Sequence, residues 1–223
     1  MAPEIQRSHT QDCIRLQTPA ADSAMIWLHG LGATNEDFVP VFKRIVSALS
    51  LNCIGLFPQA PTRPVTFSAG MPMPCWYDIL GASPKRIINE EDLHASAQRI
   101  QSMINDLQNE GIAADRIFIA GFSQGGAVAY ETALTFDKPL AGLICLSTYL
   151  GRPVSPADTS LPVFCAHGTR DDVVPLTLGK NTRDELNAMG LTAQWQTYPI
   201  QHEVSLPEIA DITDFVSHQL AKS

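Results

Sequence analysis

Short runs of apolar residues recur along the chain, separated by longer stretches of mixed polarity. Runs of this kind predict strands that are buried on both faces of a sheet. They span residues 24–28, 53–57, 116–120, 140–146 and 163–166. Residues 192–198 alternate between polar and apolar side chains and predict a last strand. Residues 12–16 predict a first strand at the edge of the sheet.

Between these runs, the spacing of apolar residues predicts helices. An apolar stripe at intervals of three and four residues extends from Leu93 to Leu107, and the acidic residues 90–92 before it suit a helix N-terminus. Residues 125–135 read as a second helix. A last helix is expected from Pro207, because proline is favoured at the first helical position.

Alternating strands and helices indicate an α/β fold, with a mostly parallel central sheet and helices on both faces. In such sheets, ligands bind at the carboxyl ends of the strands. The chain contains no repeat, low-complexity tract or linker, so residues 1–223 are predicted to form one domain. Residues 62–79 are rich in Pro, Met and aromatics and are not expected to form a simple helix or strand.

Composition and charge narrow the classes of function. The net charge is −8 and Lys/Arg clusters are missing, which disfavours binding to nucleic acid or to an anionic membrane. No apolar run approaches the roughly 18 residues of a membrane span. The first 19 residues lack the apolar stretch of a secretory signal, so we expect a cytoplasmic protein.

The five cysteines are widely spaced and form no C-x-x-C motif, so neither a metal site nor a disulfide framework is expected. Most should be small apolar residues of the core. Cys75 differs because it lies in the segment 62–79, where a thiol reagent could reach it.

The first candidate for chemistry is Ser123, in the G-x-S-x-G pattern GFSQG of residues 121–125. The pattern is weak by itself, but it gains meaning between a predicted strand and a predicted helix. Glycines at both ends relieve collisions in a tight turn where the serine backbone is strained. The hydroxyl of Ser123 then stands at a helix N-terminus, which favours developing negative charge.

A serine hydroxyl is a weak nucleophile and needs a base that is oriented by an acid. On this kind of fold, the acid and then the base follow the serine along the chain. His202 lies between the last strand and the last helix, and we predict that it is the base. His167 ends a strand and is expected to be structural, while His218 should be solvated on the last helix.

The acid is expected in the loop after residues 163–166, where position favours Asp171 and Asp172 equally. An oxyanion hole requires two backbone N–H donors. One is predicted from Gln124, and the other from the loop 29–32, HGLG. A dinucleotide loop is the alternative for this G-L-G, but Asn35 stands where the third glycine is needed.

With these residues, the chain resembles the phospholipase/carboxylesterase family of α/β-hydrolases, which includes bacterial carboxylesterases and acyl-protein thioesterases. The similar segments, between Ala24 and Leu220, are WLHGLGA, FPQAPTRPVT, WYDI, GFSQGGAVA, LSTYL, HGTRDDVVP and YPIQHEV. The resemblance implies the following roles: Ser123 as nucleophile, Asp171 as acid, His202 as base, and Leu31 and Gln124 as oxyanion donors.

The resemblance further implies hydrolysis of acyl esters and thioesters without a cofactor or metal, often by a homodimer. An alternative is an acyl-protein thioesterase dedicated to lipid-modified proteins, or a lysophospholipase; a non-catalytic ligand-binding relative and a peptidase are further classes. The chain departs from the family at Ser68-Ala69, commonly Asn-Gly, and at Gln201, commonly Gly. Both departures lie near the expected site, and neither removes a catalytic group.

The chain is close to the smallest size for this architecture, so we expect no large lid and an open cleft. The segment 62–79 and the loops around Leu31 and residues 173–176 should form its walls. Methionine suits a pocket that accepts varied shapes. The residues predicted to contact the acyl chain are Met71, Met73, Trp76, Val174 and Leu176.

Overall fold

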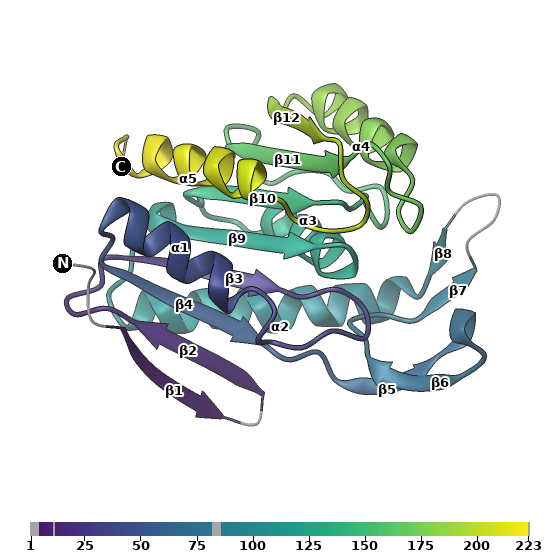
Figure 1. Cartoon of the computed structure of the whole chain (residues 1–223), viewed down its shortest axis with the longest axis horizontal. Coiled ribbons are helices and arrows are strands. Elements are labelled where there is room, and N and C mark those ends of the chain that lie inside the picture. Colours follow the sequence, from purple (N-terminus) through teal and green to yellow (C-terminus); the bar gives the residue numbers. More distant parts are fainter. Residues whose placement is uncertain (1–4, 11, 82–85, 223) are drawn as a thin grey trace.

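The computed structural model describes residues 5–10, 12–81 and 86–222, and a central eight-stranded sheet organises them (Figure 1). In sheet order the strands are β1 (Gln6–Thr10), β2 (Cys13–Gln17), β4 (Cys53–Pro58), β3 (Ser23–Leu28), β9 (Ile117–Phe122), β10 (Gly142–Leu146), β11 (Val163–Gly168) and β12 (Ala193–Tyr198). The strands from β4 to β12 in this order pair in parallel. Strand β2 is antiparallel to both of its neighbours, β1 and β4. The predicted mostly parallel sheet is therefore confirmed.

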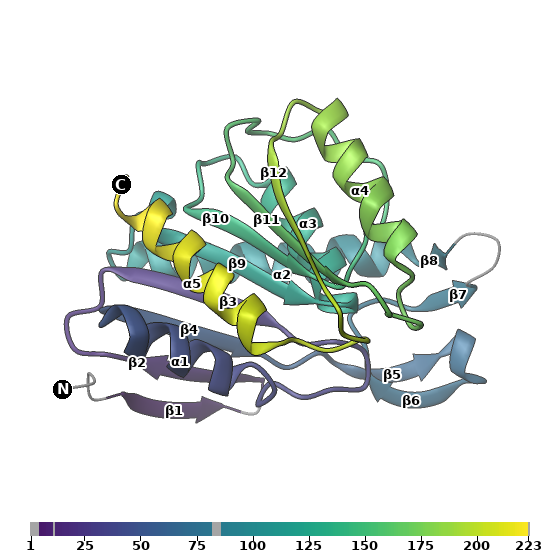
Figure 2. The ribbon, with the colours of Figure 1, turned by 45° about the horizontal axis from the view of Figure 1, so that its top comes forward.

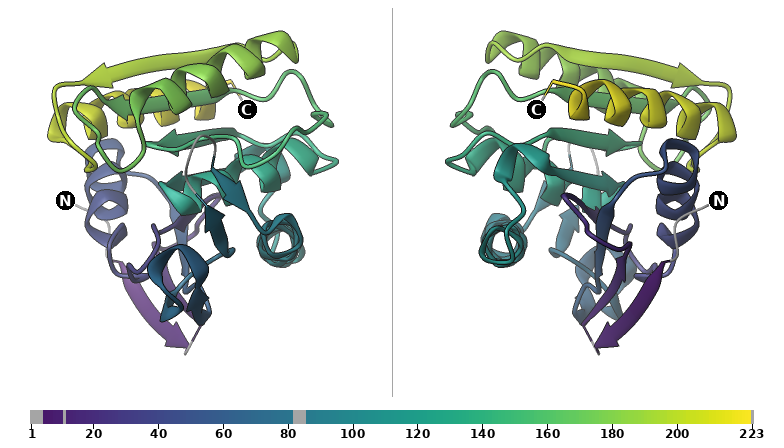
Figure 3. Two further views of the ribbon diagram at one scale, coloured as in Figure 1. Left: turned by 90° about the vertical axis from the view of Figure 1, so that its right-hand side faces the viewer. Right: turned by 90° about the vertical axis from the view of Figure 1, so that its left-hand side faces the viewer.

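The apolar runs form strands whose side chains are buried on both faces, because helices cover both faces of the sheet. Every residue of β3, β4, β10 and β11 is buried. Helices α1 (Val39–Leu49) and α5 (Leu206–Leu220) pack on one face (Figure 3). Helices α2 (Glu90–Asn109), α3 (Gln124–Thr135) and α4 (Leu176–Ala188) pack on the other. This is the predicted α/β arrangement.

The edge of the sheet differs from the prediction. Residues 12–16 were expected to form the edge strand, but β2 is the second strand and β1 forms the edge. All five side chains of β1 are exposed, so its sequence QRSHT carries no apolar signal. It is defined by antiparallel pairing with β2, from Gln6 opposite Gln17 to Thr10 opposite Cys13.

The segment between β4 and α2 forms two hairpins, which agrees with the expectation that residues 62–79 are not a simple helix or strand. Strands β5 (Thr62–Val65) and β6 (Met71–Pro74) pair around a short 3-10 helix, Thr66–Ser68. Strands β7 (Ile79–Gly81) and β8 (Ile87–Ile88) form the second hairpin. Both hairpins project at the end of the sheet where β3 and β9 end (Figure 2).

These hairpins leave the carboxyl end of the sheet without a large cover. Among residues 5–10, 12–81 and 86–222, no helical domain is inserted there, as expected for this fold. None of the helices in those residues combines the length and the apolar character needed to cross a membrane.

Candidate active site

Ser123 occupies the sharp turn between β9 and α3. Its backbone has φ 54° and ψ −121°, a conformation that costs a non-glycine residue strain energy unless its surroundings fix it. Its N–H donates to the carbonyl oxygen of Leu146 at 2.9 Å, and the hydroxyl of Thr148 donates to the Ser123 carbonyl oxygen at 2.6 Å. Strand β10 and the loop after it therefore hold the serine in place.

The glycines that flank Ser123 are required by close backbone contacts. A Cβ on Gly121 would lie 2.4 Å from the carbonyl oxygen of Gly125. A Cβ on Gly125 would lie 2.4 Å from the carbonyl oxygen of Leu28, at the end of β3. Side chains at both positions would collide with the neighbouring helix and strand, which confirms the steric reason inferred from the pattern.

The structure brings Ser123, His202 and Asp171 together from three loops at the carboxyl end of the sheet. Nε2 of His202 lies 2.9 Å from Oγ of Ser123, and Nδ1 lies 2.7 Å from Oδ2 of Asp171. The second oxygen of Asp171 accepts the N–H groups of Val173 and Val174 at 3.0 and 2.8 Å. These bonds keep the carboxylate oriented toward Nδ1–H of His202, which leaves Nε2 free to accept from the serine.

The geometry separates residues that the sequence left as alternatives. Asp172 is exposed to solvent, whereas Asp171 is buried against His202. His167 is buried under the same loop, and its Nε2 lies 2.8 Å from the carbonyl oxygen of Val174. Burial lowers the pKa of His167, so a neutral ring that donates to this carbonyl supports the loop. His218 is exposed on α5, as expected.

The loop after β3 passes directly beside the serine. A Cβ on Gly30 would lie 3.5 Å from Cβ of Ser123. The ring of His29 shapes the loop: Nδ1 contacts the carbonyl oxygen of Gly30 at 2.7 Å, and Nε2 accepts the N–H of Ala60 at 3.1 Å. Burial lowers the pKa of His29, which favours the neutral ring that these two bonds need.

The two backbone N–H groups predicted to form an oxyanion hole belong to the residues that directly follow Gly30 and Ser123 in the chain. Gln124 is the first residue of α3, and the first N–H groups of a helix have no partner within the helix. Leu31 lies in the loop beside Ser123, next to Gly32, whose N–H donates to the carbonyl oxygen of Pro74 at 2.8 Å. Hairpin β5–β6 therefore holds the end of this loop.

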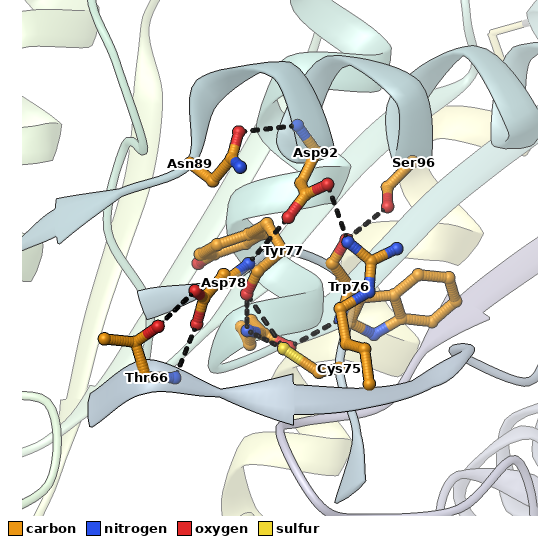
Figure 4. Close-up of polar contacts among 10 residues, drawn as sticks. Thr66, Cys75, Trp76, Tyr77, Asp78, Asn89, Asp92 and Ser96 are labelled. Atoms are coloured by element: carbon orange, nitrogen blue, oxygen red, sulfur yellow. Dashed lines mark hydrogen bonds and ion pairs between the residues drawn. The ribbon is translucent and has the colours of Figure 1, made fainter. Parts of the chain in front are cut away.

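Residues 75–78, which we call the crosspiece, lie between hairpin β5–β6 and helix α2 (Figure 4). The amide of Gln124 reaches it through both of its atoms: Oε1 accepts the N–H of Trp76 at 2.9 Å, and Nε2 donates to the carbonyl oxygen of Tyr77 at 2.8 Å. Nε2 also contacts Sγ of Cys75 at 3.3 Å. Both polar atoms of the Gln124 side chain are thus bonded to the crosspiece.

Helix α2 anchors the crosspiece from the other side (Figure 4). The N–H of Asp78 donates to the carboxylate of Asp92 at 3.1 Å, and Arg63 of β5 forms an ion pair with the same carboxylate at 2.7 Å. The carboxylate of Asp78 accepts both the N–H and the hydroxyl of Thr66. One pair of carboxylates therefore connects α2, the crosspiece and hairpin β5–β6.

The residues predicted to contact the acyl chain have different environments. Met71 is 62% exposed on β6, and Leu176 is partly exposed at the start of α4. Met73 is partly buried, and its Sδ lies 3.6 Å from the position that a Cβ on Gly32 would take. Trp76 and Val174 are both 0% exposed, so neither side chain reaches the surface.

A cavity of about 220 Å³ lies between α4 and the loop that follows β10. Its lining residues are Arg86, Tyr149, Leu150, Gly151, Leu178, Asn181, Thr182 and Glu185. The guanidinium of Arg86 lies 5.0 Å from the ring centre of Tyr149 and donates to the carbonyl oxygen of Val173 at 3.0 Å. Sequence analysis did not predict this cavity, because its lining comes from separate segments, and only Tyr149 and Leu150 belong to a segment, LSTYL, that carried the resemblance.

A mostly parallel sheet with a serine at the strand–helix turn, and with acid and histidine after later strands, defines an α/β-hydrolase. The chain belongs to the phospholipase/carboxylesterase family, whose model matches residues 10–220. It is an ester-hydrolysing enzyme. The match extends the resemblance, carried by segments between Ala24 and Leu220, toward the N-terminus.

Individual proteins agree with this assignment. Acyl-protein thioesterase 1 of Neurospora crassa is 38% identical over 216 residues, covering 90% of this chain and 88% of that protein. Acyl-protein thioesterase 1 of Yarrowia lipolytica is 33% identical over 93% of this chain and 96% of its own length. The crystal structure of Arabidopsis thaliana SOBER1 superposes with a TM-score of 0.83 and 28% identity, covering 89% of this chain and 99% of that one.

Proposed function

We propose that the chain hydrolyses acyl esters through a covalent acyl-enzyme, with Ser123 as nucleophile, His202 as base and Asp171 as acid. The observation that carries this proposal is the continuous hydrogen-bonded chain from Oγ of Ser123 to Nε2 of His202, and from Nδ1 to Asp171. A nucleophile, a base and a group that orients the base are the parts that acyl transfer needs.

In the proposed reaction, His202 removes the proton of Ser123 as Oγ attacks the acyl carbonyl carbon. The carbonyl oxygen becomes an oxyanion, which the N–H groups of Leu31 and Gln124 stabilise. His202 then gives its proton to the leaving alcohol or thiol. Water repeats the two steps on the acyl-enzyme, which releases the carboxylic acid and restores Ser123.

The assignment is tested by labelling with a fluorophosphonate probe, whose fluoride is displaced by an activated serine oxygen. The wild-type chain should be labelled at Ser123, and Ser123→Ala should not. Ser147 provides a matched control, because it is also buried and has a positive φ of 46°, but its hydroxyl has no hydrogen-bond partner among the described residues. Equal labelling of wild type and Ser123→Ala would disprove the role of Ser123.

A thioesterase acting on lipid-modified proteins is the second candidate, supported by the relatives that are named acyl-protein thioesterase 1. The hairpins leave the carboxyl end of the sheet without an inserted helical domain, which suits access by a bulky substrate. Turnover of p-nitrophenyl esters, S-acylated peptides and lysophospholipids should be compared. A preference for small soluble esters would contradict a dedicated deacylase, and a preference for lysophospholipids would favour a lysophospholipase.

The acyl chain is proposed to lie against Met71, Met73 and Leu176, with Trp76 and Val174 supporting the wall from below. Met73 carries most of this proposal, because its sulfur borders the loop of Gly32. Met73→Ala is expected to raise KM for long acyl esters more than for short ones.

We further infer a single catalytic domain that works in the cytoplasm without a cofactor or metal and forms a homodimer. The resemblance to the phospholipase/carboxylesterase family supports the dimer. Sedimentation of the purified chain tests the dimer, and microscopy of a tagged chain in its native cell tests the location.

A further inference from the structure

All three polar groups of Trp76 form hydrogen bonds, and Figure 4 shows those of its backbone to Gln124 and Ser96. Its backbone N–H donates to Oε1 of Gln124 at 2.9 Å, and its carbonyl oxygen accepts the hydroxyl of Ser96 at 2.6 Å. Its indole Nε1–H donates to the carbonyl oxygen of His29 at 2.8 Å. The residue is 0% exposed, so no water competes for these bonds.

Two of these bonds end on the segments that carry the proposed oxyanion donors. One holds the side chain of Gln124, whose own backbone N–H is the first donor. The other holds His29, two residues before Leu31, the second donor. We propose that Trp76 is a positioning residue that fixes the separation and direction of these two N–H groups; this inference rests on the proposed serine hydrolase mechanism.

The physical reason is that donors help only when they already point at the oxygen that becomes charged. Leu31 lies in a loop, where the backbone can move, whereas Gln124 lies at the start of a rigid helix. A direct bond from the indole to the carbonyl of His29 ties this loop to the helix through one buried side chain. Phenylalanine would fill most of the same space but lacks the N–H.

Packing of the aromatic ring alone does not explain why position 76 is a tryptophan. The ring of Trp76 lies 5.3 Å from the ring of His29, and the guanidinium of Arg99 lies 5.9 Å from its ring centre. These contacts stabilise the core, and a large aromatic ring would retain part of them. The hydrogen bond to His29 is separable from them, because it depends on a single N–H group.

The test compares Trp76→Phe with Trp27→Phe. Trp27 is 1% exposed, and its indole nitrogen has no hydrogen-bond partner among the described residues, so this control removes the same atoms without removing a bond. A second variant, Trp76→benzothienylalanine, replaces the N–H by sulfur and keeps the ring volume. Thermal unfolding of each variant shows whether it is folded.

Two measurements separate positioning from general damage. The first is hydrolysis of a p-nitrophenyl ester of a short fatty acid. The second is inhibition by an alkyl trifluoromethyl ketone: Oγ of Ser123 adds to its carbonyl carbon, the serine proton passes to His202, and the ketone oxygen becomes the oxyanion. Removing one oxyanion donor costs about 100-fold to 1000-fold in kcat, so a misplaced donor should cost about 10-fold to 100-fold.

We expect both Trp76 variants to lose kcat by about 10-fold to 100-fold with a change in KM below about threefold, and to lose affinity for the ketone in proportion. Trp27→Phe should retain wild-type kcat. Wild-type kcat in a folded Trp76→benzothienylalanine variant would overturn the inference. So would a loss of kcat with unchanged ketone affinity, because the oxyanion site would then be intact.

The outcomes also distinguish this inference from the proposed function. If the wild-type chain is not labelled by a fluorophosphonate at Ser123, the mechanism itself is wrong and the role of Trp76 falls with it. If the wild type is labelled at Ser123 and the Trp76 variants hydrolyse the ester at the wild-type rate, only the positioning role is wrong.

Discussion

At the scale of single residues, hydrogen bonds decide which of two adjacent aspartates orients His202. Asp171 and Asp172 are adjacent carboxylates, yet only Asp171 is buried and contacts His202. The N–H groups of Val173 and Val174 select the first carboxylate, because they bind its second oxygen and fix its plane. Position in the loop did not distinguish the two, since both follow the same strand.

This difference leads to a prediction for the two carboxylates. Asp171→Asn should lower kcat by about four orders of magnitude, because an amide in place of the carboxylate favours the wrong tautomer of the base. Asp172→Asn should leave kcat within about twofold, as expected for an exposed side chain without a role. Steady-state hydrolysis of a p-nitrophenyl ester measures both, and equal losses in the two variants would contradict the assignment.

Trp76 shows where residue-level prediction from sequence ends. The motif WYDI indicated that this tryptophan lies near the site, and the structure agrees with that. The motif did not indicate whether the indole faces the cleft or the core. That direction is set by Gln124, His29 and Ser96, which lie 48, 47 and 20 residues away along the chain.

At the scale of secondary structure elements, strands with strong apolar patterns were predictable and hairpin β5–β6 was not. Pro64 and Pro72 face each other in this hairpin, and proline lacks the N–H that a central strand requires. A two-stranded hairpin tolerates it because each strand has a free edge. The hairpin is held instead by the ion pair between Arg63 and Asp92 of α2, which no local pattern reveals.

The turn of this hairpin contains a strained residue. Ala69 has φ 55° and is followed by Gly70 with φ 75°, at the position where the family commonly has glycine. The left-handed conformation costs a residue with a Cβ about 1–2 kcal/mol. Ala69→Gly should therefore raise the free energy of unfolding by about 0.5–1 kcal/mol, after the extra flexibility of glycine in the unfolded chain is deducted.

Urea unfolding measures this change. Ala48→Gly is the matched control, because Ala48 is an exposed residue within α1 and the same substitution should lower stability by about 1 kcal/mol there. A loss of stability in Ala69→Gly similar to that in Ala48→Gly would show that Ala69 is not strained.

Helix α5 begins directly after the loop of His202 and contains a buried acid. Ser205 and Glu208 form a reciprocal capping box, and Oε1 of Glu208 has no partner among the described residues. Burial raises the pKa of Glu208 from 4.5 to about 7. Because the folded chain holds this proton more tightly than the unfolded chain, the contribution to stability is complete below pH 4.5 and is lost as the pH rises through 7.

Glu208→Gln should remove this dependence while keeping the capping box. Relative to wild type, the variant should gain about 2–3 kcal/mol of unfolding free energy between pH 5 and pH 8. Asp214→Asn on the exposed side of the same helix should show no such gain. Denaturant unfolding at several pH values measures it, and parallel curves for wild type and Glu208→Gln would contradict a raised pKa.

At the scale of the whole molecule, the sheet and its two layers of helices were predictable because the short apolar runs indicate strands that are buried on both faces. The proposed catalytic residues could be placed at the carboxyl end from sequence, because the carboxyl ends of all the parallel strands meet at this edge. Distances such as 2.9 Å between Ser123 and His202 depend on how β9 and β12 twist past β10 and β11. No local pattern encodes that twist.

The layers of the molecule also protect its thiols. Cys53, Cys75, Cys145 and Cys165 are buried, and burial raises the pKa of each; for Cys53 and Cys165 it does so to about 12. Native chains should therefore react with DTNB only at Cys13, which is partly exposed, and slowly because its pKa is also raised. In guanidinium chloride all five thiols should react.

Absorbance during DTNB titration counts the reactive thiols, and Cys13→Ser serves as the control that should show none in the native state. Cys75 was singled out as a reagent target from its place in the segment 62–79. Its Sγ instead donates to the carbonyl oxygen of Tyr77 at 2.9 Å, so activity should survive the reagent. Rapid inactivation that Cys75→Ser prevents would refute this expectation.

The chain between β4 and α2 contains both segments that can vary between relatives and a residue that must stay in place. Its hairpins lie at the carboxyl end of the sheet, and exchanging them between relatives is expected to change substrate range without altering Ser123, Asp171 or His202. The same stretch carries Trp76, which connects Gln124 to His29 below the surface. A pair of hairpins transferred from a relative would therefore give an active enzyme with new specificity only if the transferred segment kept Trp76 at its position. Residues that set the substrate range and a residue that supports catalysis thus lie close together in the sequence.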